Sequence, residues 1–259
     1  MMTIPFLSNR MLLSFLIAAF TLFFAGSPSL FALPASALGN SGEQPAIIVG
    51  FTGGFVRHDD IVHGEVEFAA RLRSEYPAGT IVETFENHNG DGAYQRIVTL
   101  LDTNHDGTLS DGEKHSARIV LYGHSWGGSE TVALARRLEK TGVPVLLTVQ
   151  VDSVEKVGED DQTIPSNVAQ AANFYQSDGL LHGETRIQAA DNSRTQILGN
   201  FRFRYDGVPY SCVNYQWYAR LLMKAHIQIE CDPRVWDRVD ALIGSTLAGG
   251  QMRGAARDD

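Results

Sequence analysis

The chain has 259 residues, of which 44% are hydrophobic and 20% are charged, and its formal net charge is -9 at pH 7. This length and apolar share suffice for one domain with a buried core, and they argue against a disordered chain. The acidic balance argues against a general nucleic-acid-binding protein, which would need a basic surface.

Residues 1–37 have the pattern of a secretory signal peptide. Arg10 is their only charged residue, an almost wholly apolar run spans 11–25, and Ala35–Ala37 offers a small-x-small cleavage site. The apolar run is short for a membrane span, which needs about 20 residues. We therefore expect cleavage, a secreted or periplasmic protein and a mature domain over 38–259. An uncleaved membrane anchor is the alternative.

Short apolar runs and helical patterns alternate along the mature domain. Residues 46–49 have the pattern of a buried strand, and apolar residues recur at helical spacing over 66–76. A strand is predicted over 80–85, a short amphipathic helix over 93–101 and another buried strand over 119–122.

The second half continues this alternation. A helix is predicted over 125–140, strands over 145–151 and 171–175, and a last helix from Pro233 onward. The polar, glycine-broken segment 177–218 is compatible with a small cap or an edge hairpin. Strands that alternate with helices predict an α/β fold with a mainly parallel sheet and helices on both faces.

The sequence Gly-His-Ser-Trp-Gly at 123–127 fits the G-x-S-x-G pattern between a predicted strand and a predicted helix. The glycines allow a sharp turn that presents Ser125 at the carboxyl edge of the sheet, and the helix N-terminus favours developing negative charge. A plain strand-to-helix turn with a capping serine is the alternative interpretation.

At this motif the chain resembles the α/β-hydrolase superfamily, in particular its serine esterases and lipases. The resemblance extends over most of 46–250, although only the serine motif is specific. It implies a triad in the chain order serine, acid, histidine, and an oxyanion loop that follows an earlier strand.

A serine nucleophile needs a histidine to take its proton and an acid to orient that histidine. Five of the eight histidines precede the motif, and His124 lies inside it, where this kind of turn points a side chain away from the site. His226 lies near the C-terminus, where the superfamily carries its base. His226 is therefore the candidate base, and His182 is the alternative.

Two aspartates are candidates for the triad acid. Asp152 directly follows the predicted strand 145–151, as the acid of some lipases does. Asp178 follows the predicted strand 171–175, which is the position that the superfamily uses most often. We favour Asp152 and keep Asp178 as the alternative.

The oxyanion donors should be backbone N–H groups. One would come from Trp126, directly after the serine, and the other from the loop after the first strand, where we favour Thr52 over Phe51. Gly53 and Gly54 would let this backbone approach a ligand closely. A simple strand-to-helix loop is the alternative.

Residues 102–113 match the twelve-residue EF-hand calcium loop. The expected ligands, with Ser110 at the position often bridged by water, are Asp102, Asn104, Asp106, the carbonyl of Thr108 and Glu113. Gly107 supplies the sharp turn. A helix is predicted before the loop and none after it, so we expect a structural Ca²⁺ site rather than a sensor. A solvated acidic turn is the alternative.

The chain has two cysteines, Cys212 and Cys231, which flank His226. An even count in an exported domain predicts one disulfide, which would stiffen the segment that carries the histidine. Two buried free thiols are the alternative.

Together these features predict a secreted serine hydrolase of the esterase or lipase type with a structural calcium site. Its partner would be a small-molecule or lipid ester, with no nucleic acid and no stable membrane span after signal cleavage. The alternative is a catalytically inactive calcium-binding module on a hydrolase scaffold.

Overall fold

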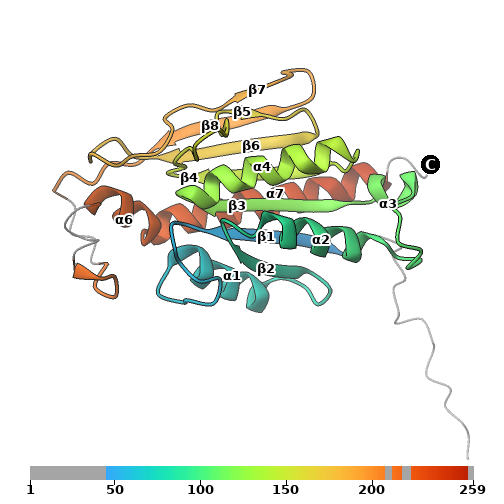
Figure 1. The fold of residues 1–259 in the computed structure, drawn as a ribbon, viewed down its shortest axis with the longest axis horizontal. Coiled ribbons are helices and arrows are strands. Elements are labelled where there is room, and N and C mark those ends of the chain that lie inside the picture. Colours follow the sequence, from blue (N-terminus) through green and yellow to red (C-terminus); the bar gives the residue numbers. More distant parts are fainter. Residues whose placement is uncertain (1–44, 208–211, 218–222, 256–259) are drawn as a thin grey trace, which may run out of the picture. The chain divides into compact units, whose positions relative to one another are not determined.

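A central parallel sheet organises the residues that the computed structural model describes, which are 45–207, 212–217 and 223–255 (Figure 1). The predicted signal peptide lies outside these residues. The six strands of the sheet are β1 (Ala46–Thr52), β2 (Ile81–Glu86), β3 (Arg118–His124), β4 (Val145–Val151), β6 (Val168–Tyr175) and β8 (Gln196–Arg202). They lie in the order β2-β1-β3-β4-β6-β8, and every neighbouring pair is parallel. The predicted α/β class is confirmed.

Helices cover both faces of this sheet. They are α1 (Gly64–Glu75), α2 (Gly90–Leu101), α3 (Asp111–His115), α4 (Trp126–Lys140), α6 (Lys224–Glu230) and α7 (Pro233–Ala255). The α1 and α7 helices pack on one face, and α2 and α4 pack on the other. Successive residues of a strand point to opposite faces, so Ile47 joins the α2–α4 core while Ile48 joins the α1–α7 core. Burial on both faces explains the unbroken apolar run of β1.

The described part of 177–218 differs from the expected cap or edge hairpin. Residues 196–202 form β8, an edge strand that runs parallel to β6. The ring of Phe201 stacks on Phe174 of β6 at 5.1 Å, so burial of this aromatic pair favours addition of a strand to the sheet. A separate two-stranded sheet pairs β5 (Thr163–Ile164) with β7 (Gln188–Ala189).

The predicted disulfide is present between Cys212 and Cys231, whose Cα atoms lie 6.0 Å apart. It joins the segment 212–217 to the residue that follows α6. A search of the described helices for a stretch that is long and apolar enough to cross a membrane finds none.

Two glycines let the first turn of α4 approach the ends of two strands. A Cβ atom at Gly127 would lie 2.3 Å from the backbone oxygen of Phe51 in β1. A Cβ atom at Gly128 would lie 2.7 Å from the side chain of Ser153, just after β4. Because real Cβ atoms do not approach other atoms this closely, the position of α4 on the sheet requires glycine at both places.

We predict that Gly127→Ala lowers the free energy of unfolding by about 1–3 kcal/mol, because the new methyl group overpacks a contact with backbone. Thermal unfolding of the purified protein measures this loss. The matched control is Gly249→Ala in α7, where no atom lies within 4 Å of an added Cβ. The control should raise stability by about 0.5–1 kcal/mol through helix propensity. Equal melting temperatures for Gly127→Ala and the parent would contradict the packing argument.

Candidate active site

Ser125 occupies a strained turn between β3 and α4. Its φ is 56° and its ψ is -125°, a conformation that residues with side chains rarely adopt. Two backbone hydrogen bonds hold the turn. The Ser125 N–H donates to the carbonyl oxygen of Val151 at 3.0 Å, and the Ser125 carbonyl oxygen accepts the N–H of Gly128 at 2.9 Å. The side chain of Ser125 is thereby fixed at the carboxyl edge of the sheet.

The structure brings together the three residues that the sequence assigned to a triad. The Oγ of Ser125 lies 2.9 Å from Nε2 of His226, and Nδ1 of His226 lies 2.7 Å from Oδ2 of Asp152. With the Nδ1 proton donated to the carboxylate, Nε2 is left to accept the serine hydroxyl. All three side chains are buried. This arrangement can remove a proton from the serine hydroxyl.

His226 is the third residue of the short helix α6, in a segment for which we predicted no helix from the sequence. The difference arises from burial, since Ile227 and Ile229 pack inside the fold on the same helix. A helix holds the imidazole more rigidly than a loop would, because the side chain then projects from a hydrogen-bonded backbone.

Asp152 is held in place by groups that the sequence did not single out. Its Oδ1 accepts the backbone N–H groups of Gln176 and Gly183 at 3.1 and 2.9 Å, and its Oδ2 accepts the side-chain amide of Gln176 at 2.8 Å. Burial alone would raise the pKa of Asp152. The hydrogen bond and charge of His226, together with the Gln176 and Gly183 donors, lower the pKa by more than burial raises it. The carboxyl pKa therefore lies below its usual value, and the group is ionised. Gln176 directly follows β6 as Asp152 follows β4, and adjacent parallel strands bring these positions together.

The two rival residues bind elsewhere. Asp178 accepts the guanidinium of Arg202 at 3.2 Å and the backbone N–H of Tyr205 at 2.7 Å. Nδ1 of His182 lies 3.1 Å from the oxygen of Gly183. Neither contact joins these side chains to Ser125.

His124 differs from the expectation that it points away from the site. Its ring centre lies 4.6 Å from that of His226, and its Nδ1 lies 3.4 Å from the Glu230 carboxylate. These contacts exist because α6 lies over the end of β3. Burial lowers the pKa of His124 to about 4, so the ring is neutral near pH 7.

The loop after β1 lies against the serine. A Cβ atom at Gly53 would be 3.0 Å from the Cβ of Ser125. The Gly53 N–H donates to the Glu65 carboxyl at 2.9 Å, and the hydroxyl of Thr52 donates to the oxygen of Val56 at 2.8 Å. Trp126 is the first residue of α4, so its N–H has no partner within that helix. The amides of Thr52 and Trp126 thus remain the candidate oxyanion donors.

A hollow of about 570 Å³ lies beside α6. Its walls are formed by Ser177, Asp178, Gly179, Leu180, Leu181, Tyr205, Asp206, Gly207, Met223, Lys224, Ala225 and Gln228. Four of these residues flank His226 along the chain, so the hollow adjoins the helix that carries the histidine. Near the serine, the exposed ring of Phe55 meets Trp126 edge-on at 5.8 Å.

The loop 102–113 has the turn that a calcium loop requires. Gly107 has a φ of 81°, and the Asp102 carboxylate accepts the N–H groups of Asp106 and Gly107 at 3.2 and 2.9 Å. A short helix, α3, begins at Asp111 within the loop and ends at His115, although the sequence predicted no helix here. It forms because Ser110 and Glu113 make a capping box.

The donor types of this loop fit a hard cation, since they are carboxylate, amide and carbonyl oxygens. The Glu113 carboxylate accepts N–H groups of Ser110 and Thr103 at 2.9 and 2.8 Å. These hydrogen bonds lower the pKa of Glu113 to about 2. Within the loop, all of which the structure describes, no three acidic side chains bring one carboxylate oxygen each to within 4.8 Å of one another. The carboxylates of Asp102 and Glu113 instead accept amides of the loop.

No protein-family model matches the chain, and no curated protein matches it. Among solved structures, a dienelactone hydrolase-like promiscuous phosphotriesterase from metagenomic libraries is 18% identical, with a TM-score of 0.35 over 81% of this chain and 89% of its own. An esterase from Pyrobaculum calidifontis is 14% identical, with a TM-score of 0.39 over 80% and 78%. An esterase from Pseudomonas putida is 12% identical, with a TM-score of 0.36 over 74% of each chain. Likeness at this level does not transfer an activity.

We predict that Asp152→Asn slows labelling of Ser125 by a fluorophosphonate probe roughly a thousandfold or more, because His226 loses the carboxylate that orients it. The rate of covalent labelling measures this effect. The matched control is Asp178→Asn, which should label within about threefold of the parent, since the Asp178 carboxylate is bonded to Arg202 and the Tyr205 N–H rather than to His226. The opposite ranking of the two variants would show that Asp178 is the acid.

Proposed function

We propose that the chain is a serine hydrolase that cleaves carboxylic esters through an acyl-enzyme. The observation that carries this proposal is the hydrogen-bonded series from Ser125 through His226 to Asp152, which ends on an ionised carboxylate. The strain at Ser125 adds support, because strained backbone clusters at active sites. A catalytically inactive scaffold would not require this strain.

The reaction follows from the positions of these groups. As Oγ of Ser125 forms a bond to the acyl carbon, Nε2 of His226 takes the proton from Oγ. Asp152 stabilises the imidazolium, and the amides of Thr52 and Trp126 stabilise the oxyanion. The proton passes from His226 to the departing alcohol as the ester C–O bond breaks. A water molecule then gives its proton to His226 and attacks the acyl carbon, which releases the acid and restores the serine.

The substrate that fits best is a small-molecule ester. Phe55 and Trp126 provide an exposed apolar surface next to the nucleophile, which suits the acyl part of the ester.

We predict that the mature protein hydrolyses nitrophenyl esters and that Ser125→Ala lowers turnover at least a thousandfold, because the acyl group then has no nucleophile to receive it. The release of nitrophenol from esters of increasing chain length, with calcium in excess, measures both activity and acyl preference. The matched control is Ser129→Ala, a buried serine of α4 whose hydroxyl is 3.4 Å from the Lys156 amide. Folded parent protein that cleaves none of these esters would contradict the ester proposal.

We also propose that the loop 102–113 binds Ca²⁺ as a structural ion. The oxygens of Asp102, Asn104, Asp106, Thr108 and Glu113 would hold it, and its charge would offset the carboxylates gathered in the loop. The support is the twelve-residue spacing together with the positive φ of Gly107. Such an ion would fasten α2 to α3, and so to the strand that leads to the serine.

For this loop we expect millimolar CaCl₂ to raise the melting temperature of the parent by several degrees, because an ion that binds only the folded state stabilises it. Differential scanning calorimetry over a calcium titration measures the shift. Glu113→Gln should abolish the response. The control Asp111→Asn should keep it, because Asp111 is exposed and stands at a position of the loop that does not ligate. A melting temperature that ignores millimolar calcium would rule the site out.

A further inference from the structure

Two buried glutamates, to which no sequence motif points, lie beside the proposed active site. Glu65 in the first turn of α1 has no exposed surface, and Glu230 at the end of α6 is 2% exposed. Together with His63 they offer atoms that all lie within 4.8 Å of one another. Two carboxylates this close repel strongly in a protein interior, so the pair keeps one proton.

The surroundings of the pair decide which glutamate carries the proton. Glu230 Oε1 accepts the Tyr215 hydroxyl at 2.8 Å and lies 2.7 Å from Nδ1 of His63, while its other oxygen faces His124. These groups outweigh the effect of burial and lower the pKa of Glu230, so this carboxyl is the ionised one. Burial and the charge of Glu230 raise the pKa of Glu65 well above its usual value. Glu65 is therefore a neutral acid that lies beside the ionised Glu230.

The pair joins two parts of the site that are far apart in the chain. Glu65 Oε1 accepts the N–H of Gly53 at 2.9 Å, and Gly53 lies against Ser125. Glu230 follows His226 by one helical turn on α6. The loop beside the nucleophile and the helix of the base are thus connected through two carboxyl groups.

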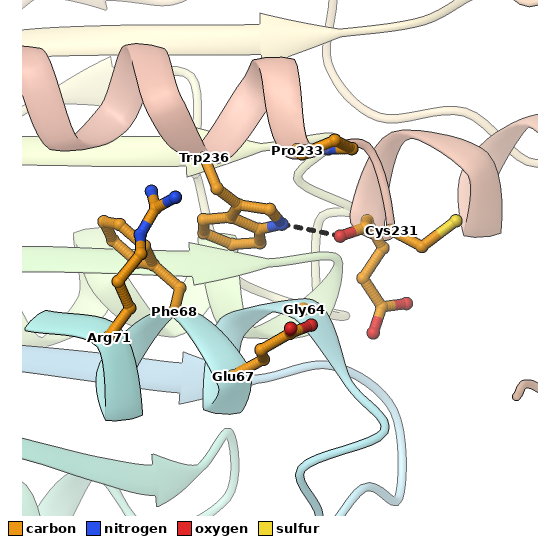
Figure 2. A pocket seen from close by; sticks show the side chains of 8 residues that line it. Gly64, Glu67, Phe68, Arg71, Cys231, Pro233 and Trp236 are labelled. Carbon is orange, nitrogen blue, oxygen red and sulfur yellow. Dashed lines mark hydrogen bonds between the residues drawn. The ribbon is translucent and has the colours of Figure 1, made fainter.

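The backbone around Glu230 is fixed as firmly as its side chain. Figure 2 shows the Trp236 indole N–H donating to the Glu230 backbone oxygen, at 2.6 Å, on the wall of a hollow of about 130 Å³. A Cβ atom at Gly64 would lie 2.1 Å from the same oxygen, so only glycine lets α1 approach α6 this closely. This close approach is what brings Glu65 to Glu230.

We propose that Glu65 is a positioning residue of the serine site, which holds the loop after β1 beside Ser125 by accepting the Gly53 N–H while it stays neutral next to Glu230. This inference rests on the proposed function. Glu65 touches no reacting atom and acts through the Gly53 amide. Its effect is to keep the neighbouring backbone amides at a fixed distance from the nucleophile.

The charge state of the pair makes the positioning depend on pH. The titratable groups that surround the Glu65–Glu230 pair are His63, Tyr122, His124 and Tyr215. Because the pKa of Glu65 is higher in the folded chain than in the unfolded chain, folding takes up a proton between those two values. The stability contributed by Glu65 is therefore complete at low pH and falls as the pH rises toward its folded pKa. When Glu65 loses that proton, its carboxylate is repelled by the carboxylate of Glu230, and this repulsion loosens the loop after β1.

The test compares Glu65→Gln with Glu65→Ala by kcat, KM, fluorophosphonate labelling and melting temperature from pH 5 to 9. Glutamine can accept the Gly53 N–H and, like the protonated glutamate, has no charge beside Glu230, so Glu65→Gln should stay within about threefold of the parent at pH 6. Alanine removes the acceptor of the Gly53 N–H and should lower kcat about tenfold to a hundredfold with little change in KM, as expected for a misplaced site. The matched control is Glu67→Ala, an exposed glutamate of the same helix.

The melting temperature separates this inference from the proposed function, because it needs no activity. The difference between Glu65→Gln and the parent should grow in favour of the variant as the pH rises. A difference that stays constant with pH would overturn the neutral-acid assignment. Equal kcat for Glu65→Ala and the parent would overturn the positioning role. Micromolar Zn²⁺ that stabilises the parent but not Glu65→Gln would also overturn it, because His63, Glu65 and Glu230 would then be metal ligands. If the parent is not labelled at all, the proposed function fails and the positioning role with it, while the melting arm still reports the proton.

Discussion

A residue with a side chain that is held at a φ of 56° costs on the order of 1–3 kcal/mol, and Ser125 bears this cost. It persists because the turn is bonded on both sides, to Val151 of β4 and to Gly128 of α4. The bare backbone of Gly127 lets the first turn of α4 lie directly against Phe51 in β1. The packing of a whole helix on the sheet therefore fixes the direction of one hydroxyl group, and the other groups of the site are arranged around it.

The acids near this hydroxyl meet the cost of burial in different ways. Asp152 is charged because Gln176 and Gly183 donate to it together with the histidine. Glu230 is charged because histidines and a tyrosine surround it, and Glu65 avoids the cost by keeping a proton. Removing one member of such a network leaves a buried group unsatisfied, which is why the polar groups behave as a unit.

Local sequence patterns predict much of the fold and the serine site. The remaining features depend on contacts between distant parts of the chain, which no local pattern shows. Buried strands show as unbroken apolar runs, and the serine motif stands between a strand and a helix. Chain order and the superfamily resemblance point to His226 and Asp152, which the structure places beside Ser125. No local pattern announces that α1 meets α6, so Glu65 and Glu230 pass unnoticed in the sequence. The unexpected direction of the His124 ring has a similar long-range cause, since α6 lies over the end of β3.

The separation of the groups along the chain has a consequence for how the molecule forms. Ser125 and His226 are 101 residues apart, and His63 and Glu230 are 167 apart. Contacts between residues so far apart in the chain form slowly, because the chain loses the entropy of loop closure before the contact contributes any stabilising free energy. The serine therefore gains its base only when α6 docks, and reactivity of that one hydroxyl would report the last step of assembly during refolding.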